Sequence, residues 1–151
     1  MEGILNNNKI IHMAELFKTE EQIEKVYRID VKTNSVNLLY EPELLNLILT
    51  EIKLRSLILD EINIYAFCIL PFHVSLVISM KEGEGEIDKW VKKFKAYITR
   101  NSSNKKLWKP KFGFEKIDLN MLNFICSEVV KQPESLGLVE NWCDYSLSFK
   151  I

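Results

Sequence analysis

The stretch from Tyr65 to Ser79, YAFCILPFHVSLVIS, constrains the fold more than any other part of the sequence. Apolar runs on either side of Pro71 predict two strands that turn at this proline and pair with each other. The second run carries two polar residues, His73 and Ser75. Side chains at positions i and i+2 of a strand point to the same face. The sequence therefore predicts two polar groups side by side on one face of an otherwise apolar strand.

The rest of the chain predicts further strands and helices. Residues 25–33 alternate as a strand does, and apolar spacing over 41–59 predicts a helix with Pro42 in its first turn. Residues 86–101 predict a basic amphipathic helix, and its apolar stripe contains Ile87, Trp90, Val91, Phe94 and Ile98.

The C-terminal third predicts an extended segment, a helix and a short strand. Residues 107–117 read as extended, and residues 119–131 as a helix that Gln132-Pro133 ends. The tail contains one short strand. This order of elements predicts an α+β fold, a small antiparallel sheet of about four to five strands backed by helices.

Bulk composition limits the class of protein. Apolar residues make up 47% and charged residues 27% of the 151, the balance of an ordinary globular domain. No apolar run reaches a membrane-spanning length, so we expect no membrane partner. The widely spaced Cys68, Cys126 and Cys143 match neither a disulfide framework nor a metal knuckle, which favours reduced thiols and a cytoplasmic protein.

The predicted domain organisation is simple. Residues 1–24 form an N-terminal extension, with a short helix around 13–26 and a surface residue at His12. Residues 25–151 form one domain.

Positive charge is concentrated in one block. Residues 89–116 hold ten Lys or Arg and one acidic residue, a net charge of +9, so the rest of the chain carries −10. Aromatic residues are interleaved with these cations. Such a block is typical of a surface that binds a polyanion. A solvated helix face with its apolar side turned inward is the other interpretation, and composition leaves both open.

Four blocks in this order resemble the single-tyrosine HUH transposases, especially the REP-associated tyrosine transposases. Residues 70–77, LPFHVSLV, resemble the family's Met-Pro-Asn-His-Val-His motif and the strand after it. Residues 91–117 resemble its basic helix and aromatic-rich extended segment, and residues 129–149 its closing segment, in which Asn-Pro precedes Gly-Leu-Val. Residues 25–34 resemble its first strand. The resemblance covers about residues 25–149 and implies an HUH-endonuclease, ferredoxin-like arrangement.

The resemblance also implies a chemistry. Two histidines on one strand bind a divalent ion, Mg²⁺ or Mn²⁺, which polarises a DNA phosphate. A helix tyrosine then attacks the phosphorus and forms a covalent phosphotyrosine link.

This sequence departs from the family pattern at the positions that carry the chemistry. Ser75 stands where the second histidine is expected, and a hydroxyl is a poorer metal ligand than imidazole. Phe72 replaces the asparagine before the first histidine. Alignment on Pro133 places the family's tyrosine at Glu128 and its asparagine at Gln132. A carboxylate is no phosphotyrosine nucleophile and repels a phosphate, so these departures together predict an impaired active site.

Other residues of the chain are candidates to replace the missing nucleophile and metal ligand. Tyr97, on the basic helix, is a candidate replacement nucleophile. Glu128 is a candidate metal ligand beside His73, with an exposed helix glutamate as the alternative. His73 itself is either a metal ligand or a partly buried strand histidine. Tyr65 and Tyr145 are expected to be structural.

The first functional hypothesis is a transposase-like protein that binds single-stranded or hairpin DNA with little or no catalysis. An active nicking transposase with a rearranged site is the second, and a protein-interaction or dimerisation module, including a homodimer, is the third. The first hypothesis assigns phosphate contacts to basic residues of the block, and base stacking or core packing to its tryptophan. The residues are Lys92, Lys93, Lys95, Arg100, Lys105, Lys106, Trp108, Lys109 and Lys111.

Overall fold

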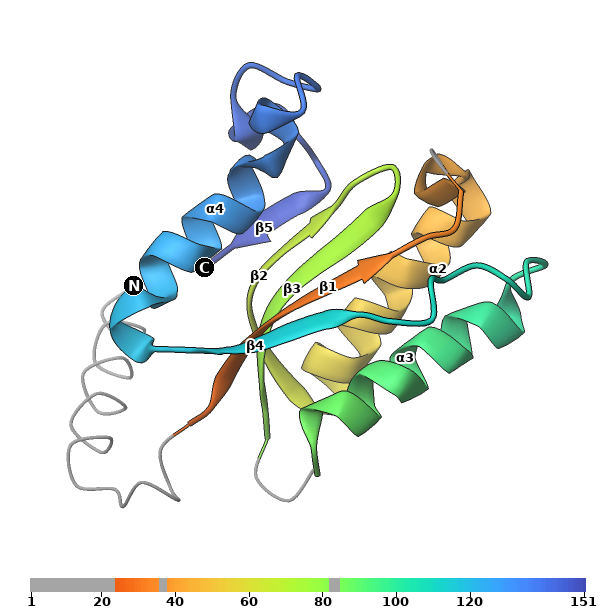
Figure 1. Cartoon of the computed structure of the whole chain (residues 1–151), viewed down its shortest axis with the longest axis horizontal. Coiled ribbons are helices and arrows are strands. Elements are labelled where there is room, and N and C mark those ends of the chain that lie inside the picture. The colour runs from red at the N-terminus through yellow and green to blue at the C-terminus, as the bar shows by residue number, and fades with distance from the viewer. Residues whose placement is uncertain (1–23, 36–37, 82–84) are drawn as a thin grey trace.

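The computed structural model describes residues 24–35, 38–81 and 85–151. They form one five-stranded sheet, packed with helices, in which every pair of neighbouring strands is antiparallel (Figure 1). The strand order is β4-β1-β3-β2-β5. The predicted α+β class and the predicted number of strands are confirmed. The short helix expected around 13–26, and His12, fall wholly or almost wholly outside the described residues.

The bounds of the elements agree closely with the sequence pattern for most of the chain. The strands are β1 (Val26–Lys32), β2 (Ile62–Ile69), β3 (His73–Met80), β4 (Gly113–Ile117) and β5 (Ser148–Lys150). The helices are α2 (Pro42–Lys53), α3 (Ile87–Asn101) and α4 (Leu122–Ser135). Within the described ranges, no helix has the length and apolar character that crossing a membrane requires.

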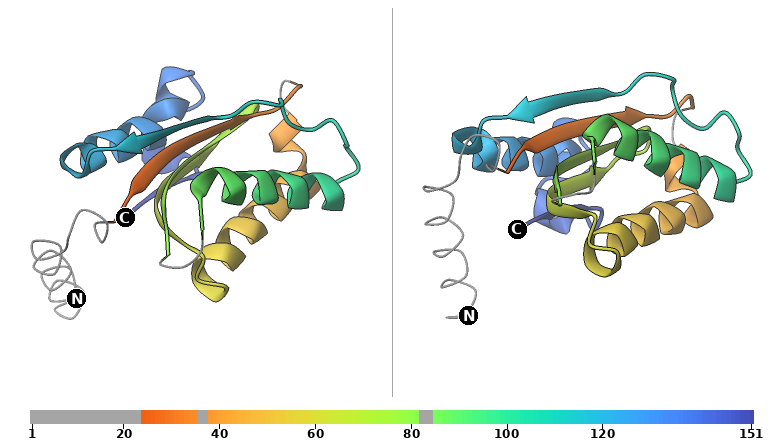
Figure 2. Two further views of the ribbon diagram at one scale, coloured as in Figure 1. Left: turned by 60° about the horizontal axis from the view of Figure 1, so that its bottom comes forward. Right: turned by 90° about the horizontal axis from the view of Figure 1, so that it is seen from below.

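Helices cover both faces of the sheet (Figure 2). On the central strand β3, Val74, Leu76 and Ile78 belong to the larger core cluster, which also contains the buried residues of α2 and α3. Val77 belongs to a second cluster with the buried residues of α4. Because strand side chains alternate between faces, His73 and Ser75 share the face that α4 covers. The predicted pairing of these two polar residues on one face is confirmed.

Helix α3 buries the predicted stripe. All five of its predicted apolar positions, from Ile87 to Ile98, are buried against the larger cluster. Lys89, Lys92 and Lys93, between them, are exposed, as an amphipathic pattern requires, whereas Lys95 is half-buried.

The helix predicted over 41–59 ends earlier than expected. The α-helix stops at Lys53, and the next turn, Leu54–Ile58, is a wider π-helical turn. Its hydrogen bond runs from the Leu59 amide to the Leu54 carbonyl, 2.8 Å away. This wider turn takes Leu59 off the apolar stripe, and its side chain is 50% exposed. Ile52, which is buried, is therefore the last residue of the stripe.

The prediction that Gln132-Pro133 ends the last helix is wrong. Helix α4 continues through Pro133 to Ser135. Proline has no N–H to donate to the carbonyl four residues earlier, which here belongs to Val129. The Gln132 side chain supplies the missing donor, because its Nε2 atom lies 3.0 Å from the Val129 carbonyl oxygen. The helix ends at Ser135, with Leu136 as its C-cap, and Gly137 follows with a φ of +72°, a conformation that favours glycine just after a helix.

The C-terminal segment returns to the sheet. Strand β5 pairs with the outer edge of β2, which confirms the predicted short strand in the tail. The Tyr145 hydroxyl donates to the Ile69 carbonyl at 2.7 Å and lies 2.9 Å from the Tyr40 hydroxyl. Tyr145 is structural, as expected, and Tyr65 packs against the α4 cluster.

Candidate functional site

A chain of hydrogen bonds joins β3, α4 and β1 around His73. The Nε2 atom of His73 lies 2.8 Å from Oε1 of Gln132, and Nε2 of Gln132 donates to Oγ of Ser75 at 3.0 Å. Ser75 in turn donates to Oδ1 of Asp30 at 2.5 Å. The two positions that resemble the family's histidine pair are thus connected through the side chain of Gln132.

The partners fix the direction of each bond. The amide Nε2 of Gln132 donates to Ser75 and to the Val129 carbonyl, so its Oε1 accepts from His73. His73 must then carry its proton on Nε2, which leaves Nδ1 as an acceptor. This Nδ1 atom is buried and has no hydrogen-bond partner among the described residues.

Burial keeps His73 neutral. Its side chain is 8% exposed, and desolvation lowers the pKa of the imidazole below 6.5. The hydrogen bond to Gln132 and the charge of Asp30 oppose this shift, while the charges of Lys32 and Arg28 add to it. The group is therefore a neutral hydrogen-bonding imidazole near pH 7.

Of the two interpretations of Glu128, the exposed helix glutamate describes this structure. One of its carboxylate oxygens lies 3.6 Å from the Arg28 guanidinium, and the side chain is 47% exposed. Arg28 also donates to Asp30 at 3.1 Å. Glu128 is thus engaged in an ion pair on β1, and it is Gln132, one turn further along α4, that reaches His73.

The residues around His73 do not fit a divalent metal ion. The described residues contain no group of three His, Cys, Asp or Glu side chains that could hold one. Asp30, the nearby carboxylate, already accepts from both Ser75 and Arg28. His73 offers one free nitrogen and Ser75 a hydroxyl that is already engaged, whereas metal sites gather three or more good ligands.

Tyr97 lies on the other side of the sheet from His73. It belongs to α3, whose buried side packs on the larger cluster, and Arg55 stacks 5.7 Å above its ring centroid. His73 faces α4 instead. Within one chain, the sheet separates the expected substitute nucleophile from the histidine.

A cavity of about 610 Å³ opens beside His73. Basic and aromatic side chains line it together with the hydrogen-bonded chain. Its lining residues are Arg28, Asp30, Lys32, Phe72, His73, Lys111, Phe112, Gly113 and Gln132.

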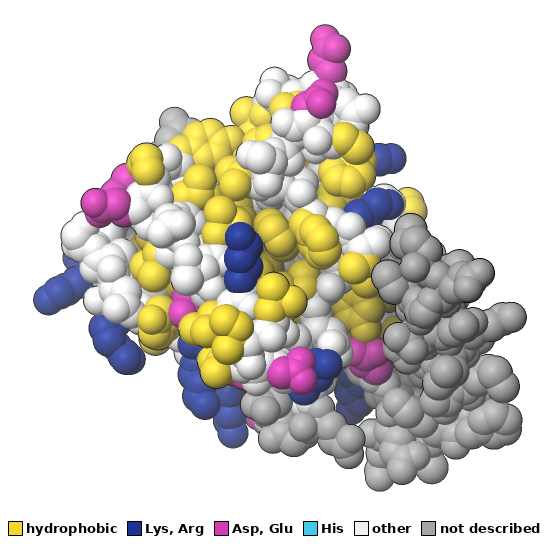
Figure 3. All heavy atoms as spheres, turned by 180° about the vertical axis from the view of Figure 1, so that it is seen from behind, with side chains coloured by type: hydrophobic (Ala, Val, Ile, Leu, Met, Phe, Trp, Pro, Cys, Tyr) yellow, Lys and Arg dark blue, Asp and Glu magenta, His cyan; other side chains and the backbone are white. Residues whose placement is uncertain are grey.

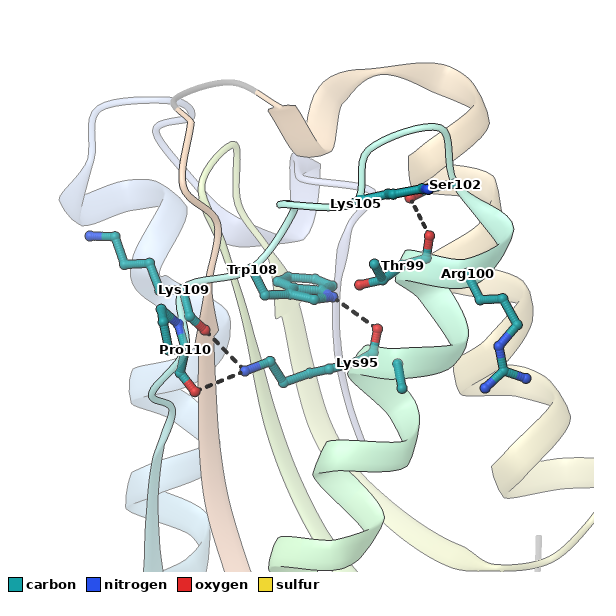
Figure 4. A pocket seen from close by; sticks show the side chains of 9 residues that line it. Lys95, Thr99, Arg100, Ser102, Lys105, Trp108, Lys109 and Pro110 are labelled. Atoms are coloured by element: carbon teal, nitrogen blue, oxygen red, sulfur yellow. Dashed lines mark hydrogen bonds between the residues drawn. The ribbon is translucent and has the colours of Figure 1, made fainter.

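A second cavity, of about 670 Å³, lies between α3 and the segment that leads to β4. Figure 4 shows Lys95 reaching across it, with its ammonium 3.0 Å from the Lys109 carbonyl and 3.5 Å from that of Pro110. In return, the indole of Trp108 donates to the Lys95 carbonyl at 3.2 Å. Lys95 therefore clamps this segment to α3.

The predicted nucleic-acid-binding residues fall into two groups. Trp108 is 8% exposed and packs in the larger core cluster, so of its two interpretations core packing describes this structure. Lys95 is half-buried, and desolvation lowers its pKa. The other predicted binding residues are exposed cations, and none of them forms an ion pair within the described residues. These are Lys92, Lys93, Arg100, Lys105, Lys106, Lys109 and Lys111.

The loop that carries Lys105 and Lys106 is anchored to the end of β1. The backbone N–H of Asn34 donates to the Leu107 carbonyl at 3.0 Å, and the side-chain amide of Asn34 donates to the carbonyls of Lys106 and Trp108. Lys109 then donates its backbone N–H to Lys32 at 2.9 Å. The basic loop thus has a defined position relative to the sheet.

Three residues of the His73 site were not predicted as functional. Arg28 and Asp30 alternate with apolar residues on β1, and this period of two was a readable sign that they share a face. Gln132 lies four residues after Glu128, which was a sign that both project from one side of α4. The contacts themselves depend on strand register, in which Asp30 pairs with Ser75.

The face turned away from Figure 1 has a different character. Figure 3 shows hydrophobic side chains gathered across its middle and no histidine. Large exposed apolar residues include three consecutive positions after α2. These are Leu57 at 77%, Ile58 at 74% and Leu59 at 50% exposure.

Comparison with solved structures identifies the fold. A REP-associated tyrosine transposase, solved bound to a REP hairpin, superposes with a TM-score of 0.69 and 20% identity, covering 82% of this chain and 75% of the other. A Deinococcus radiodurans protein described as a transposase gives 0.50 and 17%, covering 76% and 96%. No family model matches the chain, and no curated protein does. The chain therefore has a fold similar to that of these transposases, and its sequence motifs resemble the same family.

Proposed function

We propose that this protein binds hairpin or single-stranded DNA through the basic face of α3 and the loop after it, and does not cut it. The observation that carries the proposal is the set of seven exposed predicted binding cations, none of which has an acidic partner among the described residues, on a fold similar to that of a hairpin-bound transposase. Phosphate neutralisation by such cations supplies most of the affinity in nucleic-acid binding.

The arrangement around His73 supports binding without cleavage. Glu128, at the position where the motif alignment puts the family's tyrosine, pairs with Arg28, and the candidate nucleophile Tyr97 lies across the sheet. His73 and Ser75 are hydrogen-bonded to Gln132, and Ser75 also to Asp30, so these side chains are engaged with one another.

Fluorescence anisotropy with labelled hairpin and single-stranded oligonucleotides tests the binding. We expect saturable binding that weakens steeply with salt and is the same in EDTA as in Mn²⁺. Charge reversal at exposed positions, Lys92→Glu with Lys93→Glu, should weaken it at least about tenfold, because it replaces attraction by repulsion. Unchanged affinity in this variant would overturn the proposal.

A covalent adduct assay tests the absence of cleavage. The wild-type chain is incubated with hairpin DNA and Mn²⁺, and then separated by denaturing electrophoresis. We expect neither a nicked strand nor a protein–DNA adduct. An adduct that disappears in Tyr97→Phe would establish the active, rearranged transposase instead.

The exposed apolar residues after α2 favour a second candidate, a module that binds a protein or dimerises. Large exposed apolar patches mark interaction surfaces. Sedimentation of the wild type and of Leu57→Asp/Ile58→Asp tests it. A dimer that this variant dissociates, together with no DNA binding, would replace the first proposal.

A further inference from the structure

We propose that the cavity beside His73 binds one unpaired nucleotide, phosphate included, without a metal ion. The inference rests on the proposed DNA binding and names the ligand of one cavity within it. The cavity, of about 610 Å³, lies within the range of small-molecule sites.

Positive charge in this cavity exceeds negative charge. Arg28 is already paired with Asp30 and Glu128. The other two cations of the lining, Lys32 and Lys111, form no ion pair with any described residue. Two unpaired ammonium groups beside a cavity favour a phosphate, and they supply the charge that a divalent ion would otherwise bring.

Aromatic and polar groups complete the lining. Phe72 and Phe112 both contribute to the cavity, and both rings are half-buried. Bases that have left a helix stack on such rings. Gln132 and Asp30 line the same cavity. Both N–H groups of the Gln132 amide are engaged, but its oxygen and the Asp30 carboxylate keep lone pairs that can accept hydrogen bonds from the edge of a base. A paired base has this edge occupied, so the lining favours an unpaired nucleotide.

His73 provides an independent sign of a ligand. Its side chain is more than nine-tenths buried, it lines the cavity, and its Nδ1 acceptor has no partner among the described residues. An unsatisfied buried acceptor costs free energy. A nucleotide that brings an N–H or O–H donor to this atom removes the cost.

The cavity also joins the basic face. Lys109 and Pro110 line the cavity beside α3, and the next three residues, 111–113, line the cavity beside His73. A DNA strand bound to the basic face therefore needs only to pass residues 109–113 to place one nucleotide next to His73.

Isothermal titration of the full chain with each 5′-deoxymononucleotide, in EDTA and low salt, tests the inference. We expect saturable binding, and about tenfold weaker binding in Lys32→Ala/Lys111→Ala, because each ammonium–phosphate bond is charge-assisted. Lys25→Ala/Lys53→Ala removes the same charge from two exposed positions outside the basic block and serves as the matched control, with affinity within about twofold of wild type. Nitrogen NMR of His73 should show the Nδ1 resonance shifting on binding.

Other ligands distinguish the possible results. Binding of a nucleoside as tight as that of its mononucleotide would overturn the role of the lysines, and equally tight binding of inorganic phosphate would overturn the role of the rings. Equal losses in both lysine pairs would show a diffuse charge effect and overturn the assignment to this cavity. If mononucleotides fail to bind but hairpins bind, the inference fails and the proposed function stands. If the reverse holds, the cavity is a nucleotide site and DNA binding fails.

Discussion

His73 and Gln132 meet through a single hydrogen bond of 2.8 Å between Nε2 of the imidazole and Oε1 of the amide. The same amide group caps the Val129 carbonyl that Pro133 leaves without a donor. One side chain thus serves both the helix and the site. The position and the rotamer of Gln132 are set by the helix, and through it the helix sets the tautomer of the histidine.

Gln132→Ala should lower the free energy of unfolding by about 1–3 kcal/mol, because Ser75, His73 and the Val129 carbonyl each lose a partner while buried. Urea denaturation measures the change. Lys131→Ala, at the exposed neighbouring position, is the control and should change stability by less than about 0.5 kcal/mol. Equal stability of the two variants would show that the hydrogen-bonded chain is not energetically important.

Stability should fall in mild acid because of His73. Burial lowers the pKa of the folded imidazole below 6.5, so the unfolded chain binds more protons in this window. The contribution of neutral His73 is fully present above about pH 6.5 and is lost as pH falls toward the folded pKa. Urea midpoints of wild type and His73→Gln, taken from pH 7.5 to pH 5, measure it. The stability of wild type relative to the variant should decrease with acid, and a constant difference would contradict the prediction.

Lys95→Met should cost about 1 kcal/mol of stability, because methionine keeps the apolar stem but loses the hydrogen bonds to the segment before β4. Lys92→Met removes the same charge from an exposed position and should leave stability within about 0.5 kcal/mol of wild type. Thermal unfolding compares the two. Identical unfolding curves would show that the clamp does not hold the segment.

The salt dependence of hairpin binding should report the number of phosphate contacts. Lys92→Ala/Lys93→Ala should reduce the slope of log K against log salt by about 0.7 to 0.9 per lost contact. Lys25→Ala/Lys53→Ala, which removes two exposed lysines outside the block, should leave the slope unchanged. Anisotropy titrations at four or more salt concentrations give the slopes. Equal slopes in both variants would place the contacts elsewhere.

Most of the fold could be predicted from periodic patterns of apolar and polar residues in the sequence. The stripe of α3, the alternation of β1 and the placement of His73 and Ser75 on one face of β3 depend on local geometry alone, so the sequence predicts them directly. The course of α4 through Pro133 could not, because a side chain in the same turn replaces the missing donor. Ser75 pairs with an aspartate 45 positions away, which only the strand register reveals. The sequence does not distinguish Lys95 from its exposed neighbours, because its hydrogen bond to the Lys109 carbonyl joins residues 14 positions apart.

Strand β5 has three residues, yet it forms the last rung on the outer side of β2. An uncovered strand edge is a template on which a foreign chain can polymerise. Residues 148–150 cover the part of the β2 edge from Ala66 to Cys68, and the short strand that then forms the margin of the sheet carries the charge of Lys150, which disfavours the addition of another strand. Loss of this short segment would leave Ala66–Cys68 without a strand partner and make that stretch of β2 an open edge on which another chain can pair.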